Sequence, residues 1–151
     1  MFSETLFSIK TLVFEYLNTM NQSGPLEIKY YNGSRDYGYG NDNYYNNWLY
    51  LMGYTYKDMT IGNPLLTSPV YLSGNPDYIR NNRVNAFHFG AAGMFKNLEY
   101  NILYTFSHNY GTYYFPFKDK TQHYFLFTCL ISNLMPYDFV LGLEMGYDQG
   151  N

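Results

Sequence analysis

The sequence predicts an all-β fold built from long antiparallel strands. The chain has 151 residues, of which 20 are Tyr and 12 are Phe, and these aromatic residues favour strands over helices. Alanine occurs only three times, and no long segment repeats its apolar residues at the helical period. No run of 18 apolar residues is present either, so we expect no transmembrane helix.

Each expected strand alternates apolar and polar residues with period two, which places the two kinds on opposite faces. We expect seven strands. Five alternate clearly, at 11–17, 48–56, 86–95, 100–109 and 139–148. A short strand is expected at 60–68, although Pro64 cannot donate a hydrogen bond to a central ladder. The seventh follows the polar stretch 110–121.

Two architectures give this alternation. A soluble sandwich buries its apolar face against a second sheet, whereas an outer-membrane barrel turns that face to lipid and the polar face to a lumen. Sandwich strands average about 5–6 residues, but membrane-spanning strands need about 9–11. The expected strands are close to the longer value, and their polar faces carry Gly, Asn, Ser and isolated carboxylates. The pattern therefore favours the barrel, with Glu15, Glu144 and Asp148 facing its lumen.

The connections alternate in length, which is typical of such barrels. Short turns are expected at "YKDM" (56–59), "KNLE" (96–99) and "MPYD" (135–138), and long polar loops at 18–46, 68–83 and 110–121. Seven strands are an odd number, whereas bacterial single-chain barrels have an even number, 8 or more. We therefore expect residues 1–151 to form part of a larger transmembrane barrel, and the alternative is that several copies associate to close one.

The long loops have a composition suited to sugars. Tyr offers a large amphipathic surface at low entropic cost, and the Asn side chain both donates and accepts hydrogen bonds. Candidate glycan-binding residues in the first loop and in "NYGTYYFPF" (109–117) are Tyr37, Tyr39, Asn41, Asp42, Asn43, Tyr44, Tyr45, Tyr113 and Tyr114. The alternative is that these residues only form an interfacial aromatic girdle and turn caps.

The heptapeptide "NDNYYNN" (41–47) stands out within the first loop. None of its side chains has an aliphatic carbon beyond Cβ, so we expect it to contribute nothing to a core. We place it at the outer boundary of the membrane, just before a strand that starts at Trp48. Asn41, Asp42 and Asn43 are then expected to face outward, with Tyr44 and Tyr45 at the headgroup level.

Several other functions are disfavoured. A net charge of −3 argues against nucleic acid, which requires a basic surface. The spacing of His88, His108 and His123 matches no metal-ligand pattern, and we expect no metal and no cofactor. Ser107 and His108 are neighbours in a strand and point to opposite faces, so "SHN" (107–109) does not form a catalytic group. Cys129 has no partner for an internal disulfide.

Four motifs carry a resemblance to a known family. In chain order they are "FEYLNTMNQSGP" (14–25), "NDNYYNN" (41–47), "IGNPLLTSP" (61–69) and "NNRVNAFHFG" (81–90). They resemble the Wzi-type capsule assembly proteins of the outer membrane, in the form found in Bacteroides-like bacteria. The resemblance implies a closed barrel of roughly 18 strands, with an upstream helical part and further strands beyond this chain. It supplies no ligand residues for this sequence.

The resemblance and the pattern together predict a non-enzymatic protein of the bacterial outer membrane. Its expected partners are capsular or other surface polysaccharide, contacted by the Tyr- and Asn-rich loops, and outer-membrane lipid. The first alternative is an outer-membrane channel or porin-like barrel, in which the lumen carboxylates tune ion selectivity. The second alternative is a soluble carbohydrate-binding sandwich, and an outer-membrane hydrolase ranks last.

Overall fold

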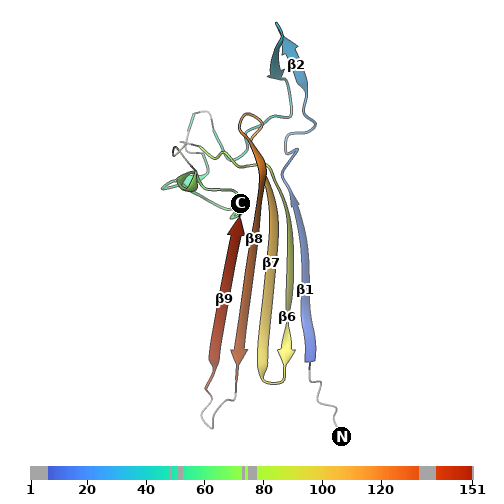
Figure 1. Cartoon of the computed structure of the whole chain (residues 1–151), viewed down its shortest axis with the longest axis vertical. Coiled ribbons are helices and arrows are strands. Elements are labelled where there is room, and N and C mark those ends of the chain that lie inside the picture. The colour runs from blue at the N-terminus through green and yellow to red at the C-terminus, as the bar shows by residue number, and fades with distance from the viewer. Residues whose placement is uncertain are drawn as a thin grey trace. The chain divides into compact units, whose positions relative to one another are not determined.

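A computed structural model describes residues 7–47, 49–50, 53–72, 74, 78–132 and 139–150, and the side chains of Arg35 and Tyr37 lie outside this description. Five long strands form one antiparallel sheet, in the order β1-β6-β7-β8-β9 (Figure 1). They are β1 (Phe7–Asn18), β6 (Val84–Phe95), β7 (Leu98–Gly111), β8 (Pro116–Ile131) and β9 (Leu141–Gly150). The predicted all-β class is therefore confirmed.

Short elements fill the connection between β1 and β6. β2 (Ile28–Tyr31) pairs with β3 (Ser34–Tyr37), and β4 (Thr55–Tyr56) pairs with β5 (Met59–Thr60). A single 3-10 turn, η1 (Pro69–Tyr71), follows. In the part of the chain that the structure describes, no helix is long and apolar enough to cross a membrane.

Two of the expected strands differ from the structure. The segment 60–68 was expected to be a strand, but β5 ends at Thr60. Beyond it, the side-chain oxygen of Asn63 accepts a hydrogen bond from the backbone N–H of Leu65, and the Asn63 carbonyl accepts one from Leu66. These bonds form a turn and use donors that a ladder would need.

The strand expected at 48–56 is also wrong over most of its described residues, and Trp48, Leu51 and Met52 lie outside the description. The Asn47 side chain accepts hydrogen bonds from the N–H groups of Leu49 and Tyr50, which again forms a turn. Gly53 then has a φ of +52°, a left-handed conformation that a strand does not contain. Among the described residues of the expected strand, only the last two, those of β4, are extended in a ladder.

The short turns are confirmed where they are described, because residues 96–97 join β6 to β7 and residues 57–58 join β4 to β5. The turn expected at 135–138 lies outside the described residues. The long loop expected at 110–121 is wrong, because β7 extends to Gly111 and β8 begins at Pro116. Lys118, Asp119 and Lys120 made this segment look like a loop, yet they lie on a strand that runs on to Ile131.

The chain divides into two compact units. The first, here called the strand unit, comprises Met1–Tyr16, Phe87–Phe106 and Thr121–Asn151. The second, called the loop unit, comprises Leu17–Ala86 and Ser107–Lys120. The first contains most of the long sheet, and the second contains both short hairpins and η1.

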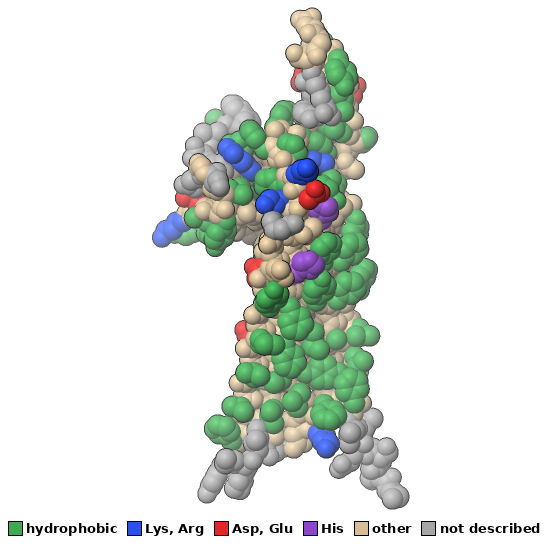
Figure 2. Space-filling view, viewed as in Figure 1, with side chains coloured by type: hydrophobic (Ala, Val, Ile, Leu, Met, Phe, Trp, Pro, Cys, Tyr) green, Lys and Arg blue, Asp and Glu red, His purple; other side chains and the backbone are tan. Residues whose placement is uncertain are grey.

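The strand unit exposes one continuous apolar face. On β9, Leu141, Leu143, Met145 and Tyr147 alternate with Gly142, Glu144, Gly146 and Asp148, and every residue of the strand is exposed. Rings on four strands continue the same face, through the contacts Phe14–Phe89, Phe89–Tyr104 and Tyr104–His123. Figure 2 shows hydrophobic side chains spread over this sheet. Leu12 is 72% exposed and Leu143 is 60% exposed.

The opposite face of the strand unit is more polar. The His88 ring nitrogen Nδ1 lies 2.6 Å from Thr105 Oγ1, and Glu144 lies across from Thr128 in the β8–β9 register. Asp148 accepts a hydrogen bond of 2.6 Å from Gln122. His88 and Asp148 also help to line a hollow of about 420 Å³. This distribution confirms the predicted two-faced character of the strands.

Candidate functional site

The loop unit is built around a small core and a network of buried amides. Leu66, Val84 and Ala86 form the apolar cluster, against which Leu17, Tyr45 and Leu65 pack. Beside it, Asn81 is fully buried and Asn82 is 2% exposed. A buried amide is costly unless its hydrogen bonds are made, so the partners of these two residues define how the loops are held.

Asn81 joins three segments of the loop unit. Its amide nitrogen donates to Thr67 Oγ1 at 3.0 Å and to Asn109 Oδ1 at 2.8 Å. Its oxygen accepts from the backbone N–H of Gly111 at 3.3 Å. Nearly all of its hydrogen-bonding capacity is therefore used inside the protein.

Asn82 fixes the heptapeptide 41–47. Its amide nitrogen donates to Asn43 Oδ1 at 2.7 Å and to the Tyr44 carbonyl at 2.9 Å. The backbone carbonyl of Asn82 accepts a hydrogen bond from Thr19 Oγ1 at 2.8 Å. Asn46 adds a two-point contact, because its side chain both donates to the Ile79 carbonyl and accepts from the Ile79 N–H, each at 2.8 Å.

These contacts correct the expectation that the heptapeptide contributes nothing to a core. Tyr45 packs against the apolar cluster and contacts the Tyr54 ring edge-on, at 5.9 Å between centroids. It has a φ of +67°, a left-handed conformation that costs on the order of 1 kcal/mol or more for a bulky residue. Asn43 does not face outward as expected, since its side chain is held by Asn46 and Asn82.

The four motifs quoted above all meet in this unit. Thr19 belongs to the first, Asn43 to the second, Thr67 to the third and Asn82 to the fourth, and the hydrogen bonds described join Thr19 to Asn82 and Asn82 to Asn43. Asn81, also in the fourth motif, joins Thr67. The motifs are thus the parts of the sequence that hold the loops together.

A pocket of about 410 Å³ opens among these loops. It is lined by Asn43, Asn46, Asn47, Tyr78, Thr112, Tyr114 and Phe115, and it is called the loop pocket below. Its size falls within the usual range for small-ligand sites, about 300–1,000 Å³. Its walls come from three parts of the chain: the heptapeptide, Tyr78, and the β7–β8 turn.

The β7–β8 turn has a fixed shape. Gly111 has a φ of +71°, and a Cβ at this position would lie 2.3 Å from the Phe115 carbonyl oxygen, so only glycine fits. Thr112 closes the turn, because its N–H donates to the Phe115 carbonyl and its Oγ1 accepts from the Phe115 N–H. Tyr114 and Phe115 remain exposed at the tip.

Two arginines stack on the aromatic rings of the loop unit. The Arg80 guanidinium lies 5.1 Å from the Tyr78 ring centre and 4.8 Å from that of Phe115. Arg83 lies 4.1 Å from the Tyr113 ring centre. Such cation–π contacts contribute about 0.5–2 kcal/mol each. The Nε atoms of Arg80 and Arg83 are buried and have no hydrogen-bond partner within the described part of the chain.

The structure brings together only some of the candidate glycan-binding residues. Asn43 and Tyr114 line the loop pocket, and Asn41 donates a hydrogen bond of 2.7 Å to the Tyr114 hydroxyl. Asp42 and Tyr44 are exposed close by in the chain, and the Asp42 N–H donates to Ser23. These residues belong to the heptapeptide and the β7–β8 turn, as expected.

Other candidates have different surroundings. Tyr39 lies under the Lys29 ammonium at 5.1 Å, next to the Lys29–Glu27 ion pair. The Tyr113 hydroxyl donates to the Met20 carbonyl at 2.8 Å, so this side chain holds two loops together. The Tyr37 side chain lies outside the described residues.

The sequence did not single out Asn46, Asn47, Tyr78, Thr112 and Phe115 as pocket residues. Asn46 and Asn47 are the last two residues of the heptapeptide, and they would have been found if all of its asparagines had been named as candidates. Nothing in the sequence around Tyr78 brings it to the β7–β8 turn, because that contact depends on the fold.

The carboxylates predicted to face a lumen and two of the three histidines have the following surroundings. Among the described residues, Glu15, Glu144 and Asp148 form no ion pair, and Asp148 accepts a hydrogen bond from the neutral Gln122. His108 stacks on Tyr110 at 4.3 Å, whereas His88 faces Thr105. No group of three or more His, Cys, Asp or Glu side chains in the described residues could hold a metal ion.

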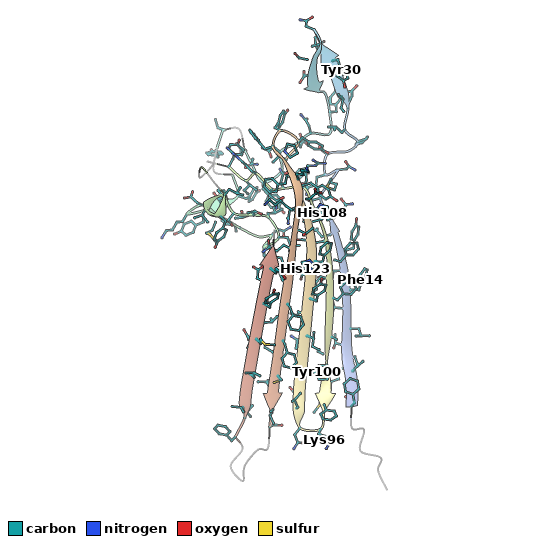
Figure 3. All side chains as sticks on the ribbon, in the orientation of Figure 1. Phe14, Tyr30, Lys96, Tyr100, His108 and His123 are labelled. Carbon is teal, nitrogen blue, oxygen red and sulfur yellow. The ribbon has the colours of Figure 1, made fainter. Side chains whose placement is uncertain are left out.

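Ser107 and His108 have different neighbours, as expected. Ser107 is buried, and its hydroxyl accepts a hydrogen bond of 3.4 Å from Asn109. Figure 3 labels His108 on β7.

Comparisons with known proteins add no relative, because no family model, no curated protein and no solved structure matches this chain.

Proposed function

We propose that this protein is a non-enzymatic outer-membrane β-barrel protein that contacts capsular or another surface polysaccharide through its loop unit. The observation that carries the proposal is the apolar face of the strand unit. Its large side chains are exposed on β1, β6 and β9 and mostly half-buried on β7 and β8, and these strands are 10 to 16 residues long. Strands of about 9–11 residues are needed to span a bilayer.

Exposure of such a face to water is unfavourable. Monomeric soluble proteins rarely expose contiguous apolar patches larger than a few hundred Å². A soluble sandwich would cover the face with a second sheet, but the only other sheets among the described residues are two hairpins of four-residue and two-residue strands. Lipid is the environment that suits this face best.

The barrel is proposed because an open sheet edge is not viable in hydrocarbon. Each unsatisfied backbone group there costs several kcal/mol, and β1 and β9 are the edges of the described sheet. Closure requires further strands beside both of them, in line with the large barrel that the resemblance to Wzi-type proteins implies.

The loop unit supports the polysaccharide part of the proposal. It presents exposed tyrosines on a framework of fixed amides, and its pocket combines aromatic rings with amides and a hydroxyl. Tyr30, labelled in Figure 3, and Tyr31 are exposed on β2. Amphipathic rings with adaptable amides are the composition expected for contact with sugars. The same four motifs that carry the family resemblance build this framework.

A pair of experiments tests the proposal. Fractionation should place the protein in the outer membrane, and deletion of its gene should release surface polysaccharide into the medium while total polysaccharide stays constant. The detergent-purified protein should bind polysaccharide extracted from the same cells. Normal retention in the deletion strain, together with no binding by the purified protein, would sink the proposal.

A channel is the second candidate function. The observation that favours it is that Glu144 and Asp148 lie on the face opposite the apolar one and form no ion pair among the described residues. Carboxylates in a lumen favour cation passage. Conductance of the protein in planar bilayers, with cation selectivity that falls in a Glu144→Gln variant, supports a channel, whereas absence of conductance excludes it.

A further inference from the structure

The loop pocket combines a fixed shape with unused hydrogen-bond donors. Its framework is set before any ligand arrives, because Asn46 is held by Ile79, Asn43 by Asn82, and the β7–β8 turn by Thr112. A preformed site binds with less loss of conformational entropy than one that must order its loops.

Two rings form one wall of the pocket. The Tyr78 and Phe115 rings lie 6.0 Å apart and are tilted by 48°, and Arg80 stacks on both. Because a single cation contacts the two rings, it holds them next to each other. Flat aromatic surfaces suit the C–H face of a sugar ring, which is apolar although its edge is polar.

The amides on the other segment supply donors for hydroxyl groups. The oxygen of Asn47 accepts from the N–H groups of Leu49 and Tyr50, and the oxygen of Asn43 accepts from Asn46 and Asn82. In both side chains the oxygen is therefore engaged, while the NH₂ group makes no hydrogen bond to another described residue. Each amide can orient this donor toward a ligand without breaking its turn.

The charges indicate which kind of sugar fits. Every described residue that lines the pocket is uncharged. An anionic group placed there would lose its hydration without a cation in the pocket wall to pair with, because the Arg80 guanidinium stacks on Tyr78 and Phe115 but does not line the pocket. The site therefore suits a neutral ring with several hydroxyl groups.

We propose that the loop pocket binds one uncharged pyranose unit of a polysaccharide. Its ring face lies against Tyr78 and Phe115, and its hydroxyl groups accept hydrogen bonds from the side chains of Asn43 and Asn47. The inference deepens the proposed function and rests on it. The pocket is not enclosed, so it takes a unit within a glycan chain as well as a free glycoside.

The test uses the full-length protein in detergent micelles and small glycosides of known charge. Isothermal titration is done with the methyl glycosides of glucose, galactose, mannose and N-acetylglucosamine, and with methyl glucuronide as the charged comparison. At least one neutral glycoside should bind, with a dissociation constant on the order of 1 mM, and glucuronide should bind at least about tenfold more weakly.

Two matched variants locate the binding. Phe115→Leu removes the ring but keeps an apolar side chain, and the affinity should fall about tenfold, as expected for loss of one aromatic contact. Phe115→Tyr should restore it. Tyr31→Leu removes a ring on β2 that is also exposed but lies outside the pocket, and it should leave the affinity unchanged.

The outcomes separate this inference from the proposed function. If extracted polysaccharide binds but no neutral glycoside does, or if Phe115→Leu binds as tightly as the original protein, the pocket assignment is wrong and the proposed function stands. Tighter binding of glucuronide than of the neutral glycosides overturns the uncharged class. Failure of the original protein to bind any polysaccharide removes the proposed function and this inference together.

Discussion

The strand unit and the loop unit place their polar and apolar groups in opposite ways. The strand unit turns Leu12, Phe14 and Leu143 outward and makes its hydrogen bonds along the backbone ladder. The loop unit buries Asn81 and Asn82 completely and uses their side chains to join loops. The two arrangements satisfy the backbone hydrogen-bonding groups in different ways. In the sheet the N–H and C=O groups pair with each other and need no water, whereas in irregular loops side chains must pair with them.

The largest effect is expected from removing the centre of the amide network. Asn81→Ala deletes three hydrogen bonds and leaves the Gly111 N–H and the Asn109 side chain without their partners. Buried groups left unpaired cost about 1–3 kcal/mol each, so we expect the loop unit to lose about 4 kcal/mol in local stability. Hydrogen–deuterium exchange of the peptides covering 78–86 and 107–116 measures this loss.

The matched control for Asn81→Ala is Asn21→Ala. Asn21 is exposed in a turn of the same unit, so the change should stay within about 0.5 kcal/mol. Equal exchange in both variants would mean that the amide network does not hold the loops.

A charge on the apolar face should have the next largest effect. Leu143→Arg places a cation where we propose lipid, and the free energy of unfolding in lipid vesicles should fall by about 2–4 kcal/mol if the site is near the bilayer midplane. Glu144→Arg changes the neighbouring residue on the opposite face and should cost much less. Urea titration of both variants in vesicles gives the comparison.

The same pair tests the two-faced character of the sheet. If water covers the apolar face, Leu143→Arg changes an exposed residue and should cost no more than about 0.5 kcal/mol. Equal unfolding free energies for the two arginine variants would therefore contradict the membrane assignment of the strand unit.

The smallest effect is expected at the rim of the loop pocket. Tyr114→Phe removes the hydroxyl that accepts a hydrogen bond from Asn41, and an exposed bond of this kind contributes about 1 kcal/mol or less. Faster hydrogen exchange should be confined to 41–47 and 112–116. Tyr71→Phe, at another exposed tyrosine of the loop unit, should leave exchange unchanged. If Tyr114→Phe instead speeds exchange over the whole unit, the Asn41–Tyr114 hydrogen bond does not act locally.

The sequence predicted four of the five long strands from alternation alone. It failed where an asparagine side chain competes with the ladder. Asn47 and Asn63 each accept hydrogen bonds from backbone N–H groups that follow them, and period-two counting does not register such turns. It also predicted that one strand begins too late, because the charged residues 118–120 resemble a loop although β8 begins at Pro116.

The loop pocket was predictable only in part. The composition of 41–47 pointed to the correct segment, and Tyr114 was named for the right reason, an exposed ring at a loop tip. The roles of Tyr45 and Tyr113 could not be read from composition, since a ring that packs against a core and a ring that faces solvent have the same side chain. Only the fold brings Tyr78 to the β7–β8 turn.

The place of β1 in the sheet has a consequence for the order of folding. β6 to β9 join neighbour to neighbour, through connections as short as the turn at 96–97, whereas β1 reaches β6 only after residues 19–83 have been looped out. Closing so long a loop costs about 3 kcal/mol more than closing a two-residue turn. We therefore expect the four later strands to pair first and β1 to pair with β6 last, so that the hydrogen bond between Thr19 and Asn82 forms only at the end.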